Sequence, residues 1–203
     1  MESQHYFSAQ PAGADIRRPL SVVLDGARRD LVTSSGLFSP DGVDKGTRIL
    51  LDGVPAPEGR RMLDIGSGWG PIALTMALRA PEATVHAVDI NERCIALTRE
   101  NATRLGLTNV RASSPDEVDA AVEFDTIWSN PPIRIGKQDL HALLLRWLPR
   151  LAPGGRAWLV VQKNLGADSL QRWLGDELPS GFAVRRAETS KSFRIIEVNR
   201  EAR

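Results

Sequence analysis

Residues 129–133 read Ser-Asn-Pro-Pro-Ile and directly follow an apolar run at 124–128 that is typical of a buried strand. The loop would therefore lie at the carboxyl end of a strand, where open α/β sheets bind ligands. Neither Pro131 nor Pro132 has an N–H, and both fix φ near about −65°, so the loop is stiff. The Asn130 side-chain oxygen and the Pro131 carbonyl could accept hydrogen bonds from a substrate amine and orient its lone pair. The pattern indicates alkylation of an amide-like or ring amine, although a plain strand-ending turn can carry the same Asn-Pro pair.

A glycine loop lies upstream, in the sequence Asp64-Ile65-Gly66-Ser67-Gly68-Trp69-Gly70. Glycines at alternate positions after a strand let a ligand lie against bare backbone. The spacing differs from the dinucleotide fingerprint G-x-G-x-x-G, and Asp64 would repel a pyrophosphate but attract a cationic amino-acid end. Asp89, nineteen residues beyond Gly70, is placed to accept hydrogen bonds from a ribose diol. Together these features predict S-adenosylmethionine as the cofactor; the Trp69 ring would either cover it or pack against the preceding segment.

The elements that position these loops alternate between strand and helix patterns. Strands are expected at 62–65, 84–88, 109–112, 124–128, 157–161, 182–184 and 193–198, and helices from 71 to 80, 92 to 105, 140 to 151 and 170 to 178. Residues 153–155, Pro-Gly-Gly, would form a loop before the strand at 157. This order predicts an α/β fold with a doubly wound parallel sheet, and the last two strands, with no helix between them, imply an antiparallel pair.

The N-terminal part is expected to form an extension of residues 1–57, followed by a main domain of residues 58–203. Runs at 20–24 and 29–33, separated by Asp25-Gly26, predict a hairpin. Apolar positions from 43 to 54 recur at helical spacing, with Asp41 as a possible N-cap. The residues before the hairpin are polar and predict a loose arm.

Composition limits the class of protein. With 203 residues, 42% of them hydrophobic, the chain fits one core, and no apolar run resembles a signal peptide or a membrane span, so a cytoplasmic protein is expected. Cys94 is the single cysteine, which excludes an internal disulfide, and it is expected to pack rather than to act as a nucleophile. His5, His86 and His141 are too scattered to predict a metal site.

The net charge is only +1, but the charges are distributed unevenly. From Arg134 onward there are 13 Lys/Arg against 7 Asp/Glu, and before it 13 against 18. Lys45, Arg134, Lys137 and Lys163 fall next to glycines or strand ends around the expected cleft. They predict contacts with RNA phosphates, while a solvated basic face is the alternative.

The motifs together resemble a known family. The runs 63–72, 88–93, 100–102 and 129–133 are similar to those of class I S-adenosylmethionine-dependent methyltransferases. The runs 5–8, 38–39, 44–47 and 135–137 narrow the resemblance to the ribosomal RNA guanine-N2 methyltransferases with the "methyltransferase small" domain.

The resemblance covers nearly the whole chain. It implies a Rossmann-like, seven-stranded, mostly parallel sheet with a reversed last strand. It also implies a catalytic loop of Asn130, Pro131, Pro132 and Ile133. The cofactor-binding residues that it implies are Asp64, Gly66, Ser67, Gly68, Trp69, Gly70, Asp89, Ile90, Ser114 and Asn130.

Three departures from that family affect the substrate and the cofactor contacts. The larger bacterial members carry an additional N-terminal copy of the domain, which this sequence does not show. Ile133 stands where many relatives have an aromatic residue that would stack on a flipped base. The loop at 112–115 has no acid for the adenine amine. Methylation of a protein glutamine amide and a catalytically silent RNA-binding module remain alternatives to methylation of a guanine amine in RNA.

Overall fold

A computed structural model describes residues 15–37, 39–190 and 192–202 of the chain. The helices and strands follow in chain order: β1 (Arg17–Leu24), β2 (Ala27–Ser34), α1 (Lys45–Gly53), β3 (Arg61–Ile65), α2 (Pro71–Arg79), β4 (Thr84–Val88), α3 (Glu92–Arg104), β5 (Val110–Ser113), η1 (Pro115–Glu117), β6 (Phe124–Ser129), η2 (Ile133–Ile135), α4 (Lys137–Trp147), η3 (Leu148–Arg150), β7 (Leu151–Gln162), η4 (Lys163–Leu165), α5 (Ala167–Glu177), β8 (Phe182–Ser190) and β9 (Phe193–Arg200). The motif at 5–8 and Phe38, both used in the family resemblance, lie outside the described residues.

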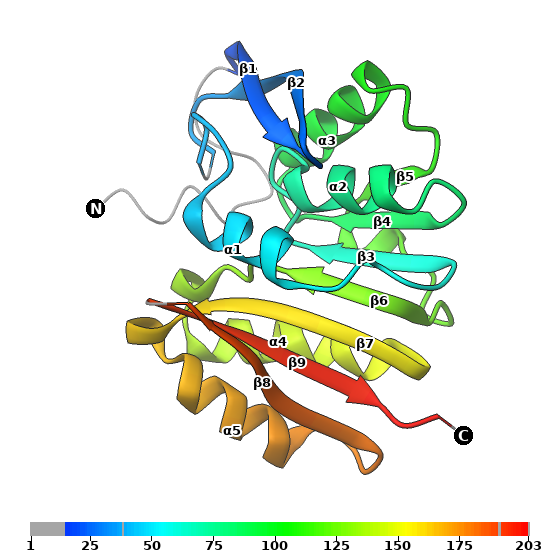
Figure 1. Ribbon diagram of the computed structural model, residues 1–203, viewed down its shortest axis with the longest axis vertical. Helices are drawn as coiled ribbons and strands as arrows, with labels where there is room; N and C mark the ends of the chain where they lie inside the picture. The colour runs from blue at the N-terminus through cyan, green and yellow to red at the C-terminus, as the bar shows by residue number, and fades with distance from the viewer. Residues whose placement is uncertain (1–14, 38, 191, 203) are drawn as a thin grey trace.

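Strands β3 to β9 form one sheet in the order β5-β4-β3-β6-β7-β9-β8 (Figure 1). The strands from β5 to β7 in this order are parallel, and β9 runs antiparallel to both β7 and β8. The predicted mostly parallel sheet with a reversed last strand is therefore confirmed. The chain passes from β3 outward to β4 and β5 and then returns to β6 on the other side of β3. The direction of winding thus reverses between β3 and β6, and open α/β sheets bind ligands at the carboxyl ends of the strands at such a point.

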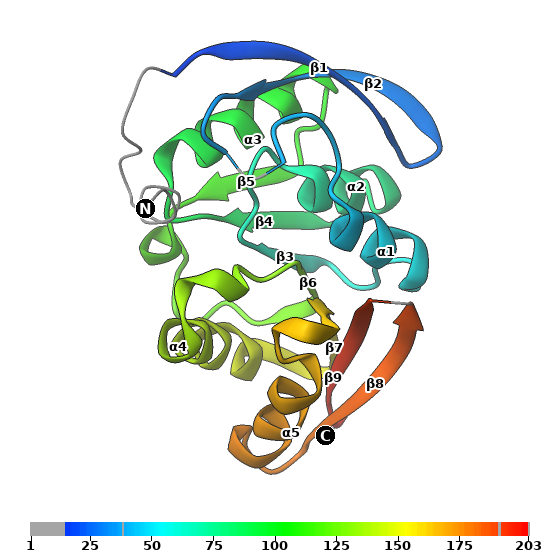
Figure 2. The ribbon, with the colours of Figure 1, turned by 90° about the vertical axis from the view of Figure 1, so that its left-hand side faces the viewer.

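Helices α1, α2 and α3 cover one face of the sheet and α4 and α5 cover the other (Figures 1 and 2), and an apolar cluster lies on each face. Met62 of β3 belongs to the cluster that includes α1 and α2, whereas Leu63, the next residue, belongs to the cluster that includes α4 and α5. Both side chains are fully buried. This alternation along β3 is the period of a strand packed between two layers of helices, and it explains the continuous apolar run in the sequence.

Two strands differ from the prediction. β7 begins at Leu151 and runs through the Pro-Gly-Gly segment that was expected to be a loop, with a register shift against β6. A side chain at Gly155 would come within 2.8 Å of the Ala152 carbonyl, so the glycine permits an irregular pairing rather than a turn. β8 extends to Ser190, well past the predicted residue 184. It is an edge strand whose mostly exposed side chains show no apolar alternation, so the sequence pattern did not indicate its full length.

The β1–β2 hairpin is confirmed. Asp25 and Gly26 have φ of 49° and 71°, as a two-residue hairpin turn requires. The hairpin lies over α2 and α3 at the end of the molecule opposite to β8 and α5 (Figure 1).

The expected N-cap at Asp41 is wrong, because Asp44 caps α1 and accepts from the N–H groups two and three residues further on. The division after residue 57 stays a prediction. No helix of the described chain is both long enough and apolar enough to cross a membrane.

Candidate active site

Four parallel strands end together at the carboxyl edge of the sheet. The pairs that close the ladder are Ile65 with Val88, Ile65 with Ser129, and Val88 with Ser113. The residues that directly follow these positions are Gly66, Asp89, Asn130 and Ser114. The register therefore brings four predicted site residues, which are dispersed over 65 positions of the sequence, to one row at the switch point.

The side chain of Asn130 is held by the start of α1, and the strand end before it is held by β3. Its Nδ2 donates to Asp44 Oδ1 at 3.1 Å and to Thr47 Oγ1 at 3.0 Å, both at the start of α1. The hydroxyl of Ser129 donates to the Ile65 carbonyl at 2.7 Å and ties the end of β6 to β3. The side-chain oxygen of Asn130 is thus left as the acceptor at its tip. Sequence reasoning did not assign Asp44 or Thr47 to the site, although residues 44–47 do carry a helix-capping pattern.

The two prolines form a tighter turn than the sequence suggests. The N–H of Ile133 donates to the Pro131 carbonyl at 2.8 Å, and Pro132 has φ −74° and ψ 74°, which together define an inverse γ-turn. The Pro131 carbonyl, which was predicted to accept from a substrate amine, therefore already accepts from one backbone N–H. Its carbonyl oxygen keeps a second lone pair for a ligand. Ile133 is partly buried against the α4 side of the core.

The glycine loop is fixed by backbone contacts and leaves an open surface. The N–H groups of Gly66 and Ser67 donate to the Val88 carbonyl at 2.8 and 3.1 Å, and the N–H of Gly70 donates to the Ser67 carbonyl at 2.9 Å. Gly68 has φ +57°, and a side chain built there would meet nothing within 4 Å. The space beside Gly68 can therefore receive a ligand against bare backbone.

Asp64 lies beneath this loop and is fully buried. Its Oδ2 accepts from the Ala73 N–H at 3.0 Å, in the first turn of α2, where the N-cap residue Gly70 has no side chain to do so. Its Oδ1 is buried without a hydrogen-bond partner among the described residues. The pKa of Asp64 is raised to about 8, mainly by burial; the Ala73 hydrogen bond opposes this shift and the charge of Asp89 adds to it. A positive charge bound at the loop would favour the ionised form.

Asp89 joins the loop to the end of β4. Its Oδ2 accepts from the Gly68 N–H at 3.0 Å and its Oδ1 from the Asn91 N–H at 2.9 Å. Burial raises the pKa of Asp89, and these hydrogen bonds oppose the shift. Because a carboxylate offers about four acceptor positions, both oxygens can still bind a diol. Ile90 follows directly and is 46% exposed, so an apolar surface lies beside the carboxylate.

Cys94 and Ser114 have local roles in the structure. Cys94 is buried in the cluster under the hairpin, as the prediction that it packs requires, and burial and then the neighbouring Asp89 raise the pKa of its thiol. Ser114 precedes the turn η1, where its carbonyl accepts from the Glu117 N–H at 3.2 Å and its own N–H donates to the Glu117 carboxylate at 2.7 Å. Ser114 lies at the edge of the row, with part of its hydrogen-bonding capacity already used.

The Trp69 ring packs away from the loop surface. It is 2% exposed, lies in the cluster under the hairpin, and donates from Nε1 to the Ser39 carbonyl at 3.3 Å. Of the two roles considered for this ring, packing against the extension is the one observed. Asn101, which sequence reasoning did not single out, donates to the Trp69 carbonyl at 2.9 Å and also binds the backbone of Val32. The glycine loop, α3 and the hairpin are thus joined through one buried amide.

The four basic residues predicted to bind RNA are all exposed and lie along the carboxyl edge of the sheet. Lys45 opens α1 next to Asp44, Lys137 opens α4, and Lys163 directly follows β7. Arg134 lies in η2, just after the prolines. Among the described residues, no carboxylate lies within ion-pair distance of any of the four. Their charges are therefore available to an anionic partner.

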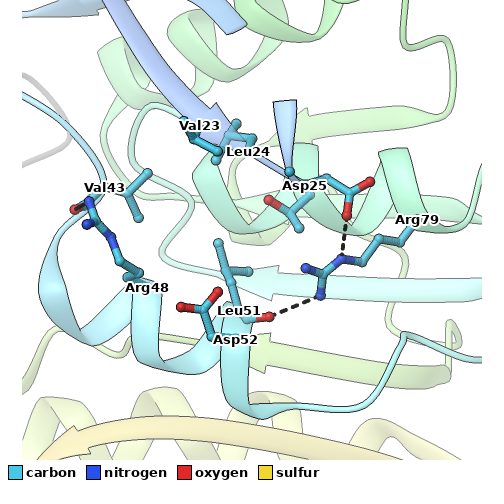
Figure 3. A pocket seen from close by; sticks show the side chains of 10 residues that line it. Val23, Leu24, Asp25, Val43, Arg48, Leu51, Asp52 and Arg79 are labelled. Atoms are coloured by element: carbon cyan, nitrogen blue, oxygen red, sulfur yellow. Dashed lines mark hydrogen bonds and ion pairs between the residues drawn. The ribbon is translucent and has the colours of Figure 1, made fainter. Parts of the chain in front are cut away.

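A pocket under the hairpin tip is separate from this edge (Figure 3). Arg79 lies across it, with Nε 3.0 Å from Asp25 Oδ1 and Nη1 donating to the Leu51 carbonyl at 3.1 Å. Arg48 donates to the Val43 carbonyl at 3.3 Å. The polar groups of the pocket thus hold the hairpin against α1 and α2, and the pocket contains none of the predicted site residues. Within the described chain, no cluster of three metal-ligating side chains is found.

Comparisons with known proteins find relatives along most of the chain. Residues 28–197 match the family model of the methyltransferase small domain. The chain is 39% identical over 202 residues to an uncharacterized protein of Bacillus subtilis, YbxB, and the match covers 98% of this chain and 99% of that protein. It is 40% identical over 141 residues to ribosomal RNA small subunit methyltransferase C of Hahella chejuensis, covering 66% of this chain and 41% of the relative. The chain thus spans less than half the length of that methyltransferase.

A solved structure shares the fold. The Thermus thermophilus 16S rRNA N2 methyltransferase RsmC, in complex with AdoMet and guanosine, superposes with a TM-score of 0.76. The superposition covers 95% of this chain and 52% of that chain, at 23% sequence identity. At this identity the likeness establishes the fold, and the chemistry has to be argued from the residues of this chain.

Proposed function

This chain belongs to the methyltransferase small domain family, as its motifs indicate, and we propose that it is an S-adenosylmethionine-dependent methyltransferase acting on the N2 amine of a guanine in RNA, in particular ribosomal RNA. The observation that carries the proposal is the row at the carboxyl edge. There the open glycine loop, the Asp89 carboxylate and the Asn130 amide lie at adjacent strand ends. A cofactor-binding loop and an amine acceptor in neighbouring positions are what transfer to an amine requires.

The residues present fit the cofactor. The bare backbone at Gly68 can receive the amino-acid end, and the partnerless Oδ1 of Asp64 places a latent negative charge below it. Asp89 has acceptor capacity for the ribose diol, and exposed Ile90 offers an apolar wall for the adenine. When bound, S-adenosylmethionine supplies a methyl group on a cationic sulfur. The protein then has to bind the cofactor, align it with the substrate and exclude water, and it needs no covalent intermediate of its own.

The acceptor loop fits an amine. The Asn130 oxygen and the second lone pair of the Pro131 carbonyl can each accept one N–H of an exocyclic NH₂. Two such hydrogen bonds hold the nitrogen in place and favour its pyramidal, nucleophilic form. Ile133, beside them, can offer apolar contact to a base taken out of its stack.

The RNA assignment rests on the exposed cations and on the relatives. Lys45, Arg134, Lys137 and Lys163 present four positive charges around Asn130. The Hahella relative is named a methyltransferase of ribosomal RNA, and a ribosomal substrate would place this protein in the cytoplasm. The chain spans less than half of that relative, and we propose that the exposed cations of this chain contact the RNA.

The decisive experiment compares ribosomal RNA from cells with and without this protein. Nucleoside mass spectrometry should find one N2-methylguanosine lost on deletion, and primer extension should map its position. Restoring the gene should restore the mark, and restoring it with Asn130→Ala should not. In vitro, purified protein should transfer labelled methyl groups to RNA from the deletion strain.

Other results would favour the alternatives. A label found on protein instead of RNA would indicate the glutamine amide as the acceptor. Binding of RNA without any binding of S-adenosylmethionine at millimolar concentration would indicate a catalytically silent module.

A further inference from the structure

The Asn130 amide has two chemically opposite ends. Its oxygen accepts hydrogen bonds and its NH₂ group donates them. A target amine is a donor, so only the oxygen suits it. The two ends are nearly equal in size, and packing alone does not select between them. A device that selects the orientation is therefore required if Asn130 is to accept an amine.

The start of α1 supplies such a device. Asp44 Oδ1 lies 3.1 Å from Asn130 Nδ2 and also accepts from the N–H groups of Gly46 and Thr47 at 2.9 and 3.1 Å. A carboxylate at this position only accepts, so turning the amide would set two oxygens against each other with no proton between them. The Thr47 hydroxyl, 3.0 Å from Nδ2, can donate or accept and therefore supports the orientation without selecting it.

Close packing keeps this device in place. A Cβ at Gly46 would lie 3.1 Å from Asp44 Oδ1, 3.1 Å from Phe193 Cε1 and 3.4 Å from Asn130 Nδ2. The missing side chain thus lets the helix start approach the amide, and the Phe193 ring closes the space behind it. The helix cap fixes Asp44, and Asp44 in turn fixes Asn130.

We infer that Asp44, supported by Thr47, is a positioning residue that turns the acceptor end of Asn130 toward the target amine. The inference rests on the proposed function for its consequence, but the orientation itself is a property of the free protein. The N-terminal extension would then be part of the active site. It would also contribute to specificity, because the opposite orientation presents a donor and rejects an amine.

Substitutions at Asp44 separate orientation from helix capping. Asp44→Ser keeps a cap for α1, but its hydroxyl can donate, so it no longer excludes the turned amide. We expect kcat to fall about tenfold or more, the effect of one lost hydrogen bond at the reacting centre, with KM for RNA unchanged. Asp44→Asn should restore most of the loss, because the helix N–H groups keep its oxygen facing Asn130.

A matched pair of threonine variants tests the second contact. Thr47→Val removes the hydroxyl at constant shape and should lower kcat less than Asp44→Ser. Thr75→Val is the control, since Thr75 is equally buried in a helix but its hydroxyl donates only to the Pro71 carbonyl. Loss of activity in Asp44→Asn equal to that in Asp44→Ser would overturn the inference, because charge rather than orientation would then matter.

Nuclear magnetic resonance of the free protein decides the orientation without any substrate. The ¹⁵N side-chain signal of Asn130, assigned by its loss in Asn130→Ala, should show slow NH₂ exchange in wild type and in Asp44→Asn. In Asp44→Ser the exchange should be faster. Fast exchange in wild type would overturn the inference. If wild-type protein methylates no RNA while this pattern holds, the proposed function fails and the orientation stands.

Discussion

Asn130→Ala removes the acceptor oxygen while the Ser129 hydroxyl still ties β6 to β3. Cofactor affinity should therefore survive. Turnover should fall by about 10²–10³-fold, the range for deleting one preorganised polar contact at a reacting centre. Single-turnover methylation of the true RNA substrate measures the effect. Rates near wild type would mean that the loop shapes the pocket and takes no part in orienting the amine.

The raised pKa of Asp64 predicts that cofactor binding is linked to the release of a proton. Burial raises its pKa from 3.8 to about 8, so in the free chain near neutral pH the carboxyl is mainly protonated. A cationic amino-acid end at the loop favours ionisation, and binding near neutral pH should release up to about one proton. Affinity should rise with pH toward about 8 and then level off. Calorimetry in buffers with different ionisation enthalpies measures the release.

Asp64→Asn is the matched control for this linkage, because its amide oxygen can still accept from the Ala73 N–H. It has no proton to release, so its binding heat should not depend on the buffer. Wild-type binding heats that do not depend on the buffer would contradict the linkage.

The raised pKa of Asp64 also affects the stability of the fold. Between the unfolded pKa of 3.8 and the folded pKa of about 8 the native carboxyl holds the extra proton, so the free energy of unfolding falls as pH rises through this window.

At the scale of elements, the hairpin and the glycine loop depend on α3 through one side chain. Asn101 is fully buried, accepts from the Val32 N–H at 2.8 Å and donates to the Val32 and Trp69 carbonyls at 2.9 Å. Val32 is paired with Pro19 in β1, but it directs both its N–H and its carbonyl to Asn101, so at this position the outer edge of β2 is satisfied by Asn101.

Asn101→Ala should therefore destabilise the fold. It leaves three buried backbone groups without partners, and at about 1–3 kcal/mol for each we expect the free energy of unfolding to fall by at least ~3 kcal/mol. Chemical denaturation measures the change. Thr103→Ala, on the exposed side of α3, is the control and should stay within about 0.5 kcal/mol. Equal effects in the two variants would show that the hairpin is held by apolar packing alone.

The sequence predicted those elements whose signals are local. The cap of α3 is such a local signal, since Asn91 Oδ1 accepts from the Arg93 N–H two residues away. The contact between Asp44 and Asn130 spans 86 positions, and only the completed fold brings the two residues together. The edge strand β8 was underestimated for a related reason, since its pairing with β9 rather than its own pattern makes it a strand.

The same distinction applies to the site. The glycine loop, Asp89 and Asn130 follow strands and were found from spacing, and the register brings them together. The Trp69 ring was left between two roles because its partner Ser39 lies 30 positions away. The hydrogen bond from the Ile133 N–H to the Pro131 carbonyl was not predicted, because it depends on the ψ of Pro132, which the proline ring does not fix.

At the scale of the whole molecule, four exposed cations without a carboxylate partner among the described residues lie where the strands end. Lys45, Arg134, Lys137 and Lys163 surround the carboxyl edge, whereas Arg60 and Arg61 lie at the amino end of β3. The edge itself is the surface on which docking would depend.

Changing both Lys137 and Lys163 to Ala should weaken RNA binding and reduce its salt dependence by up to about one phosphate contact for each lysine. Cofactor affinity should hold, since neither side chain belongs to the glycine loop. The matched control is Arg60 and Arg61 to Ala, which removes the same two charges at the opposite edge and keeps the backbone bonds of both residues to Asp125. A long-range effect of net charge would weaken both double variants equally, whereas docking at the carboxyl edge requires a larger loss and a flatter salt slope in the lysine variant. Filter binding over a range of salt concentrations separates the two. A wild-type slope in the lysine variant would mean that these side chains form a solvated face and that the phosphate backbone contacts another surface.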